Sequence, residues 1–176
     1  MIHLKIFLML MTLLLSSCSN ADDLKTFPQF VTQDLDGVEV TNKVFNYKQI
    51  TVVNVWTIDS QPSIALLKEL SNLKGDWQVI GIVGDVHDAS EQIKTAKKIA
   101  ADNSNFENLI ANSDFNDLLV TIEQVPITFF VNSRSQFIGQ PVIGDDIVLI
   151  RRELMRLLDI SSQEDLKFIQ DNIFYK

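Results

Sequence analysis

ITVVNVWTIDSQPS, residues 50–63, joins a run of β-branched and apolar residues to the start of a helix through one short turn. The run from Ile50 to Trp56 is too continuously apolar for an edge strand, so it predicts a central strand that is covered on both faces. Ser60 or Asp59 can cap the helix that follows, and Pro62 suits a first turn, where no backbone N–H needs a partner. We therefore expect a buried strand, a turn and a helix in direct succession.

Helix and strand patterns alternate after this turn. Apolar residues at helical spacing follow Ser60 and end before Gly75: Ile64, Leu67, Leu70 and Leu73. Residues 77–83, WQVIGIV, predict a second buried strand, and residues 90–102 predict a second helix that Ser90 can cap. This order predicts parallel strands with right-handed crossovers, and functional residues at the carboxyl ends of those strands.

Antiparallel pairs are predicted on both sides of this parallel unit. Phe27–Val31 and Asp34–Val40 predict a hairpin that turns at Asp36-Gly37. The remaining expected elements are a strand at 106–111, a helix at 114–121, a hairpin of strands at 127–132 and 137–143, a helix at 146–158, and an amphipathic tail at 161–176 that forms a further helix.

The first residues have the pattern of a secretory signal. Ile6–Leu15 is almost unbroken in apolar side chains, but its roughly 10 residues fall short of the roughly 20 that span a bilayer as a helix. Leu15-Ser16-Ser17-Cys18 is similar to the lipobox of bacterial lipoproteins, in which the cysteine receives diacylglycerol and cleavage occurs directly before it. The alternative is a plain secretory signal that contains a free cysteine.

The lipobox resemblance implies a signal peptide at 1–17 and a lipidated tether at 18–26. The pattern of expected elements adds a domain at 27–160 and a helical tail at 161–176. Lipid on Cys18 would hold the domain at a membrane, facing outside the cytoplasm. If the host has two membranes, Ser19 after Cys18 resembles lipoproteins that are sorted to the outer membrane. We thus expect a protein of the cell envelope.

Composition limits the chemistry of the chain. A formal net charge of -8 and the lack of a basic cluster argue against nucleic-acid binding, which depends on Lys and Arg. Cys18 is the single cysteine among 176 residues, so an acylated Cys18 would leave the mature protein without a thiol for redox catalysis.

Three segments resemble the thiol-disulfide oxidoreductases of the TlpA and ResA type. Residues 52–63, VVNVWTIDSQPS, resemble the family's VVNFWAxWCxPC segment, and residues 125–131, VPITFFV, resemble its VPTTFxID, in which the proline follows a cis peptide bond. Asp34-Leu35-Asp36-Gly37 resembles the family's early DLDG hairpin. The resemblance extends from about Phe27 to Leu158. It implies a thioredoxin-like α/β fold, in which helices flank a central mixed sheet that carries an N-terminal hairpin extension.

The chain departs from this family at the residues that perform its chemistry. Ser60 and Ser63 stand where the family has its two cysteines, and Asp59 stands where it commonly has tryptophan. A disulfide relay needs a thiolate and a second sulfur, and peroxidase chemistry begins with oxidation of a thiolate, so serine supports neither. The resemblance therefore implies an inactive remnant that needs no cofactor.

The family resemblance also implies a role for the loop at Val125-Pro126. In thioredoxin-like proteins the residue before this proline offers backbone hydrogen bonds to an extended peptide, and Val125 matches that position. Trp56 and Asp59 would then form a wall of the same groove. These residues predict a protein that holds a polypeptide partner. The alternatives are that the proline turn only sets the entry to a strand and that Trp56 belongs to the core.

The sequence gives less support to other possible catalytic or metal-binding groups of residues. Ser60, His87 and an aspartate could form a hydrolytic triad, but no nucleophile elbow accompanies them. His87 beside Asp85 and Asp88 could bind a metal, but there is no second histidine or thiolate to join it. The calcium-like Asp34, Asp36 and Gly37 lack the later ligands of such a loop, so we interpret them as a turn.

Two rival functions stay open at this point. One is an oxidoreductase that obtains a sulfur or cofactor from elsewhere. The other is an accessory lipoprotein whose outer helices or tail bind a complex of the cell envelope.

Overall fold

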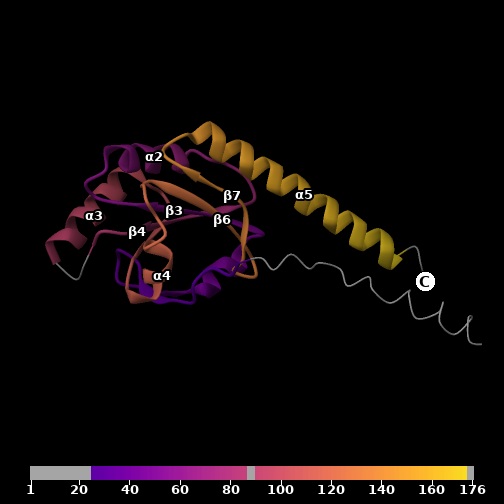
Figure 1. Ribbon diagram of the computed structural model, residues 1–176, viewed down its shortest axis with the longest axis horizontal. Coiled ribbons are helices and arrows are strands. Elements are labelled where there is room, and N and C mark those ends of the chain that lie inside the picture. The colour runs from indigo at the N-terminus through magenta and orange to yellow at the C-terminus, as the bar shows by residue number, and fades with distance from the viewer. Residues whose placement is uncertain (1–24, 87–89, 174–176) are drawn as a thin grey trace, which may run out of the picture.

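The computed structural model describes residues 25–86 and 90–173, which form a mixed sheet of five strands with helices on both faces (Figure 1). The strand order is β5-β4-β3-β6-β7, and β1 and β2 form a separate hairpin. The elements are β1 Val31–Gln33, β2 Glu39–Thr41, the 3-10 helix η2 Asn42–Tyr47, β3 Ile50–Trp56, α2 Gln61–Ser71, β4 Gln78–Val83, α3 Ser90–Asn103, β5 Glu107–Ile110, the 3-10 helix η3 Ser113–Phe115, α4 Asn116–Leu119, β6 Ile127–Asn132, β7 Phe137–Ile143 and α5 Ile147–Ile173.

Strand β3 is the centre of the sheet, and all seven of its residues are buried. On one face, Val53 and Val55 pack in a cluster with phenylalanines from the N-terminal segment, η2 and η3. On the other face, Ile50 and Val52 pack against α2 and α5. Figure 1 shows the same layers, with α2, α3 and α5 on one side of the sheet and α4 on the other. Burial on both faces explains why this strand is apolar throughout.

Strand directions bring the ends of four strands to one edge of the sheet. β3 and β4 are parallel, and so are β4 and β5. β6 is antiparallel to β3, with Val55 opposite Ile127, so the start of β6 lies beside the end of β3. Residues that follow Trp56, Val83 and Ile110 therefore share this edge with residues that precede Ile127. We call it the functional edge.

The predicted architecture is confirmed, with corrections to the bounds of three segments. In the N-terminal hairpin, the first strand is Val31–Gln33 and the second is Glu39–Thr41. The second strand starts later than predicted because Asp34 belongs to the turn, where its Oδ1 accepts the N–H groups of Asp36 and Val38 at 2.9 and 2.8 Å. The predicted helix at 114–121 is a 3-10 turn followed by the four residues of α4. The late start of the second strand and the 3-10 turn come with local side-chain bonds to the backbone, which hydropathy patterns do not reveal.

The prediction that a helix ends at Leu158 is wrong. α5 continues without a break from Ile147 to Ile173, into the stretch that was expected to form a separate helix. Neither glycine nor proline occurs in this range, and polar residues alone do not stop a helix. Its first half is fixed to the sheet by Ile150, Leu154 and Leu157. No helix in the described ranges has the length and apolar character of a membrane span.

Candidate functional site

The turn between β3 and α2 lies at the functional edge and ends in a capped helix. Ser60 is the N-cap of α2, and its Oγ accepts the N–H of Ser63 at 3.3 Å. Pro62 is in the first helical turn, as predicted. Of the two residues proposed for the cap, the structure therefore selects Ser60. Asp59 is exposed beside it.

Ser63 faces the interior one helical turn after Ser60 and has no exposed surface. Its Oγ has no hydrogen-bond partner among the described residues, and the same holds for the buried Oδ1 of Asn54 on β3. Buried hydroxyl groups are nearly always paired, because an unpaired one costs free energy. The space around position 63 therefore accommodates a small side chain, but its described neighbours provide no hydrogen-bond partner for a hydroxyl group.

Asp85 supports the turn from the neighbouring strand end. Its two carboxylate oxygens accept the N–H of Ile58 at 3.0 and 3.2 Å. Burial raises the pKa of Asp85, and the nearby charge of Asp59 adds to this rise. Sequence reasoning considered Asp85 only as a companion of His87, so its role in the turn was missed. Its place directly after a buried strand was the available signal.

We expect Asp85→Asn to change the pH dependence of stability. Because the folded-state pKa is above the ordinary 3.8, the folded chain keeps this proton to higher pH than the unfolded chain. The resulting stabilisation is complete below pH 3.8 and is lost as the pH rises through the folded-state pKa. An asparagine keeps one oxygen for Ile58 and does not titrate. Urea unfolding at a series of pH values should therefore show the variant gaining stability relative to wild type as the pH rises.

Glu153→Gln is a control with the opposite sign. The hydrogen bond from Arg156 lowers the pKa of Glu153 below 4.5. Its stabilising contribution is present above pH 4.5 and is lost as the pH falls through the folded-state pKa. This variant should therefore lose stability relative to wild type as the pH rises. If the stability of Asp85→Asn relative to wild type also falls as the pH rises, or does not change with pH, the assignment of a raised pKa to Asp85 is wrong.

Trp56 ends β3 and belongs to the core. Its side chain has no exposed surface, and its Nε1 donates to Oδ1 of Asn108 on β5 at 3.0 Å. The indole reaches Asn108 across β4, where Gly81 leaves room for the bond. Of the two interpretations of Trp56, the geometry supports the core, because a fully buried ring offers no surface to a groove.

The loop before β6 combines a cis peptide bond with unpaired backbone groups. The Val125-Pro126 bond is cis. The carbonyl of Pro126 accepts the N–H of Gly144 at 2.8 Å, whereas the N–H and carbonyl of Val125 have no hydrogen-bond partner within residues 25–86 and 90–173. Val125 is half-buried, and the side chain of Ile143, opposite Ile127, is 60% exposed. Free backbone groups thus lie beside apolar surface.

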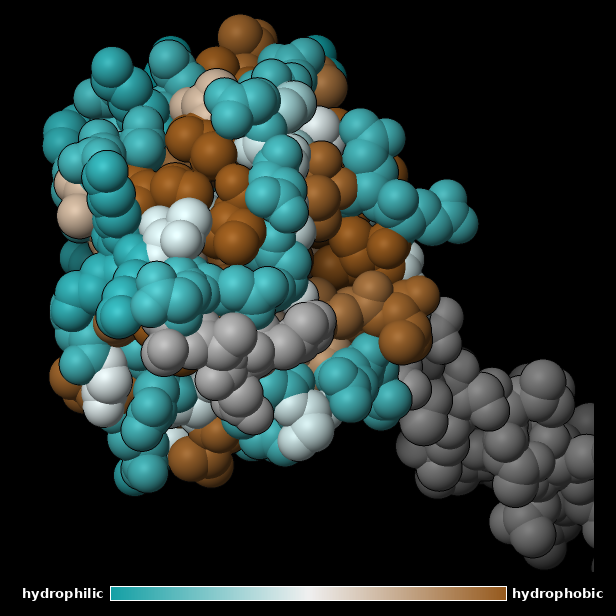
Figure 2. All heavy atoms as spheres, turned by 90° about the vertical axis from the view of Figure 1, so that its left-hand side faces the viewer, coloured by the Kyte–Doolittle hydropathy of each residue, from teal (hydrophilic) through white to brown (hydrophobic). Residues whose placement is uncertain are grey.

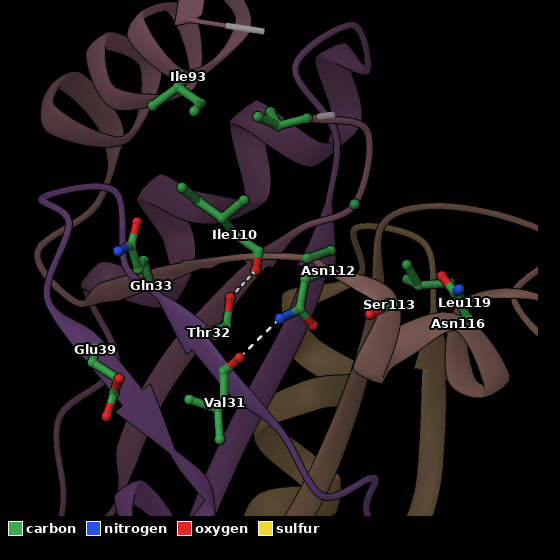
Figure 3. A pocket seen from close by; sticks show the side chains of 13 residues that line it. Val31, Thr32, Gln33, Glu39, Ile93, Ile110, Asn112, Ser113, Asn116 and Leu119 are labelled. Atoms are coloured by element: carbon green, nitrogen blue, oxygen red, sulfur yellow. Dashed lines mark hydrogen bonds between the residues drawn. The ribbon is translucent and has the colours of Figure 1, made fainter. Parts of the chain in front are cut away.

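A cleft of about 680 Å³ opens at the other half of the functional edge (Figure 3). It lies between the β1–β2 hairpin, the ends of β4 and β5, the first turn of α3, and α4. Its lining residues are Val31, Thr32, Gln33, Glu39, Gly84, Val86, Ile93, Ile110, Ala111, Asn112, Ser113, Asn116 and Leu119. The side of the molecule that carries α3 faces the viewer in Figure 2, which shows apolar side chains bordered by polar ones. No pattern in the sequence predicted this cleft.

The structure brings some of the predicted site residues to the same edge of the sheet, and others lie outside the described residues. Ser60, Asp59 and Val125-Pro126 lie along the functional edge, from the end of β3 to the start of β6. Cys18, His87 and Asp88 lie outside the described residues, and so does the side chain of Ser90. Within the described ranges, no group of three or more His, Cys, Asp or Glu side chains is placed to hold a metal ion.

Comparisons with known proteins find similarity in structure. No family model and no curated protein matches the chain. A protein of Chlorobium tepidum, assigned as a thiol:disulfide interchange protein DsbE, superposes with a TM-score of 0.62 at 12% identity, over 77% of this chain and 96% of that one. The chain has a thioredoxin-like fold. At this identity, the match establishes the fold and not the activity.

Two further thioredoxin-like structures give the same result. The thioredoxin domain of a thiol-disulfide oxidoreductase from Bacteroides vulgatus has a TM-score of 0.57 at 17% identity, over 74% of this chain and 95% of that one. The exposed lipoprotein thioredoxin of Streptococcus pneumoniae has a TM-score of 0.52 at 19% identity, over 70% of this chain and 96% of that one. The fold expected from the sequence is thus confirmed.

Proposed function

We propose that this chain is a redox-inactive thioredoxin-like protein that holds an extended polypeptide segment at Val125. The unpaired N–H and carbonyl of Val125 are the observation that carries this proposal. An extended peptide can pair with such groups as an added strand would. The exposed side chain of Ile143 next to this loop supplies apolar surface for the peptide's own side chains.

The absence of redox chemistry follows from the side chains at the start of α2. Ser60 and Ser63 lie at the start of α2, where the sequence resemblance to the TlpA and ResA type places a pair of cysteines, and a hydroxyl cannot form a disulfide. The unpaired Oγ of Ser63 supports an origin from cysteine, because a thiol is a weaker hydrogen-bonding group and is buried at lower cost. Ser60 keeps a structural role as the cap of α2.

We further propose that lipid on Cys18 anchors the domain to the outside of the cytoplasmic membrane or to the outer membrane. The lipobox-like sequence before Cys18 supports this, and one structural neighbour is itself named as an exposed lipoprotein. Mass spectrometry of the N-terminal peptide of the mature protein tests the anchor. A chain that begins at Cys18 with added acyl mass is expected, and an unmodified cysteine would overturn this part of the proposal.

A second candidate function is thiol-disulfide exchange, because the structural neighbours include proteins named as oxidoreductases. It would need a sulfur from a partner or cofactor. Insulin reduction by the full chain with Cys18→Ser separates the two candidates: the binding function predicts no turnover, and measurable turnover would favour the enzyme.

Photocrosslinking tests the polypeptide site directly. A benzoylphenylalanine is placed at Val125 or, on a more exposed side chain, at Ile143. The control position is Tyr47, which is 74% exposed near the opposite end of β3. The probe is reduced and carboxamidomethylated ribonuclease A, an unfolded basic polypeptide. Crosslinks from positions 125 and 143 with only background from position 47 are expected, and equal yields from all three would overturn the proposal.

A further inference from the structure

The cleft beside the β1–β2 hairpin has the size of a ligand site, and both apolar and polar side chains line it. Its volume of about 680 Å³ is within the range of roughly 300–1,000 Å³ found for ligand pockets. Ile110 and Leu119 contribute apolar surface from β5 and α4, and Ile93 adds more from α3 (Figure 3). An apolar side chain of a ligand would therefore be favoured inside.

Two backbone carbonyls at the rim of the cleft are already paired, whereas two side-chain amides there have no hydrogen-bond partner among the described residues. The carbonyls of Ile110 and Val31 already accept bonds from Thr32 and Asn112, which Figure 3 shows as dashed lines. By contrast, the exposed side-chain amides of Gln33 and Asn116 form no hydrogen bond within the described part of the chain. Each of these amides offers both a donor and an acceptor, which complement a peptide group.

Charge narrows the class of ligand. Glu39 is the single charged side chain among the described residues that line the cleft. Without a lining Lys or Arg, the described cleft offers no charged partner to a phosphate, and without a lining aromatic ring it offers no stacking surface to a base. Glu39, on a chain with a net charge of -8, favours a cationic ligand and disfavours an acidic one.

The cleft and the Val125 loop lie along one edge of one sheet. Gly84 lines the cleft and donates to the carbonyl of Trp56 at 2.9 Å, and Pro126 lies on the other side of β3. Three strand spacings separate β5 from β6, which is about 14 Å, or roughly four to five residues of an extended peptide. One bound segment can therefore reach both places.

We propose that this cleft is the specificity pocket of the polypeptide site, taking an apolar side chain and placing a lysine or arginine of the partner next to Glu39. The assignment of the ligand as polypeptide rests on the proposed function at Val125. The backbone of Val125 recognises any extended chain, whereas the cleft selects which sequence binds.

Fluorescence anisotropy with labelled synthetic peptides tests the charge preference. The peptides share one apolar sequence and differ only in a Lys, Gln or Glu near the end that would reach the cleft. With the full chain, the Lys peptide is expected to bind on the order of fivefold more tightly than the Glu peptide, the scale of an exposed charge pair. Glu39→Lys is expected to reverse this order. Equal affinities, or an order unchanged by Glu39→Lys, would overturn the inference.

Asn116→Trp tests the cleft itself by filling it from an exposed position on α4. The Lys peptide is expected to lose at least about tenfold in affinity, because a cleft that is already filled cannot take the peptide side chain. Gln163→Trp, at an exposed amide on α5, is the matched control and should leave affinity unchanged.

The two proposals fail in different ways. If Asn116→Trp leaves affinity unchanged while position 125 still crosslinks the unfolded probe, the cleft inference is wrong and the proposed function stands. If no peptide binds and position 125 gives only background, both are wrong. If Asn116→Trp abolishes peptide binding while position 125 gives only background, the cleft binds peptide and the Val125 loop does not.

Discussion

The double substitution Ser60→Cys/Ser63→Cys, made together with Cys18→Ser, is expected to produce a thiol-disulfide activity that the parent chain lacks. A thiol at position 60 would lie at the N-terminus of α2, where the helix dipole lowers its pKa and favours the reactive thiolate. Position 63 would supply the resolving sulfur one turn later, where Ser60 and Ser63 are already joined by a hydrogen bond. Insulin reduction in the presence of a small dithiol measures the gain.

Single substitutions are the controls for this gain. Ser60→Cys alone should form mixed disulfides without turnover, because no second thiol resolves them. Ser63→Cys alone should give no activity but should raise the free energy of unfolding by about 1 kcal/mol, since it removes an unpaired buried hydroxyl. If the double variant forms no disulfide between positions 60 and 63, these serines do not stand at the positions of a redox pair.

Gly81→Ala is expected to destabilise the fold by about 2 to 5 kcal/mol. A Cβ at this position of β4 would lie 2.0 Å from Oδ1 of Asn108 and 3.0 Å from Nε1 of Trp56, which are the two atoms of a buried hydrogen bond. The added methyl group must displace one partner, and both polar groups are then left unpaired inside the core. Urea unfolding measures the loss, and Trp56 fluorescence should change with it.

Gly84→Ala is the matched control, three residues further along the same chain segment. There the nearest atom to an added Cβ is Cγ1 of Val55 at 3.6 Å, an ordinary van der Waals contact. The expected change is below about 1 kcal/mol. Equal losses for the two variants would show that the Trp56–Asn108 bond does not set the requirement for glycine at position 81.

Local patterns were sufficient for most of the architecture. The apolar run of β3, the cap at Ser60 and the proline before β6 each act within a few residues, so the sequence alone predicts a strand, a helix start and a strand entry at these places. The end of α5 shows the limit of such patterns. Nothing near Leu158 interrupts a helix, and a change from apolar to polar residues was mistaken for a boundary.

The candidate site, in contrast, depends on contacts between residues that are distant in the chain. Asp85 supports Ile58 from 27 residues away, and Asn108 pairs with Trp56 from 52 residues away. The cleft joins the hairpin, α3, β5 and α4, which no single pattern connects. Hydrophobic periodicity indicates which face of each element is buried. The sequence alone therefore determined the elements and their order, and it also placed two serines at the start of α2. Only the packing of the elements decided which polar groups meet, which stay unpaired and where a cavity is left, because these depend on strand order and register.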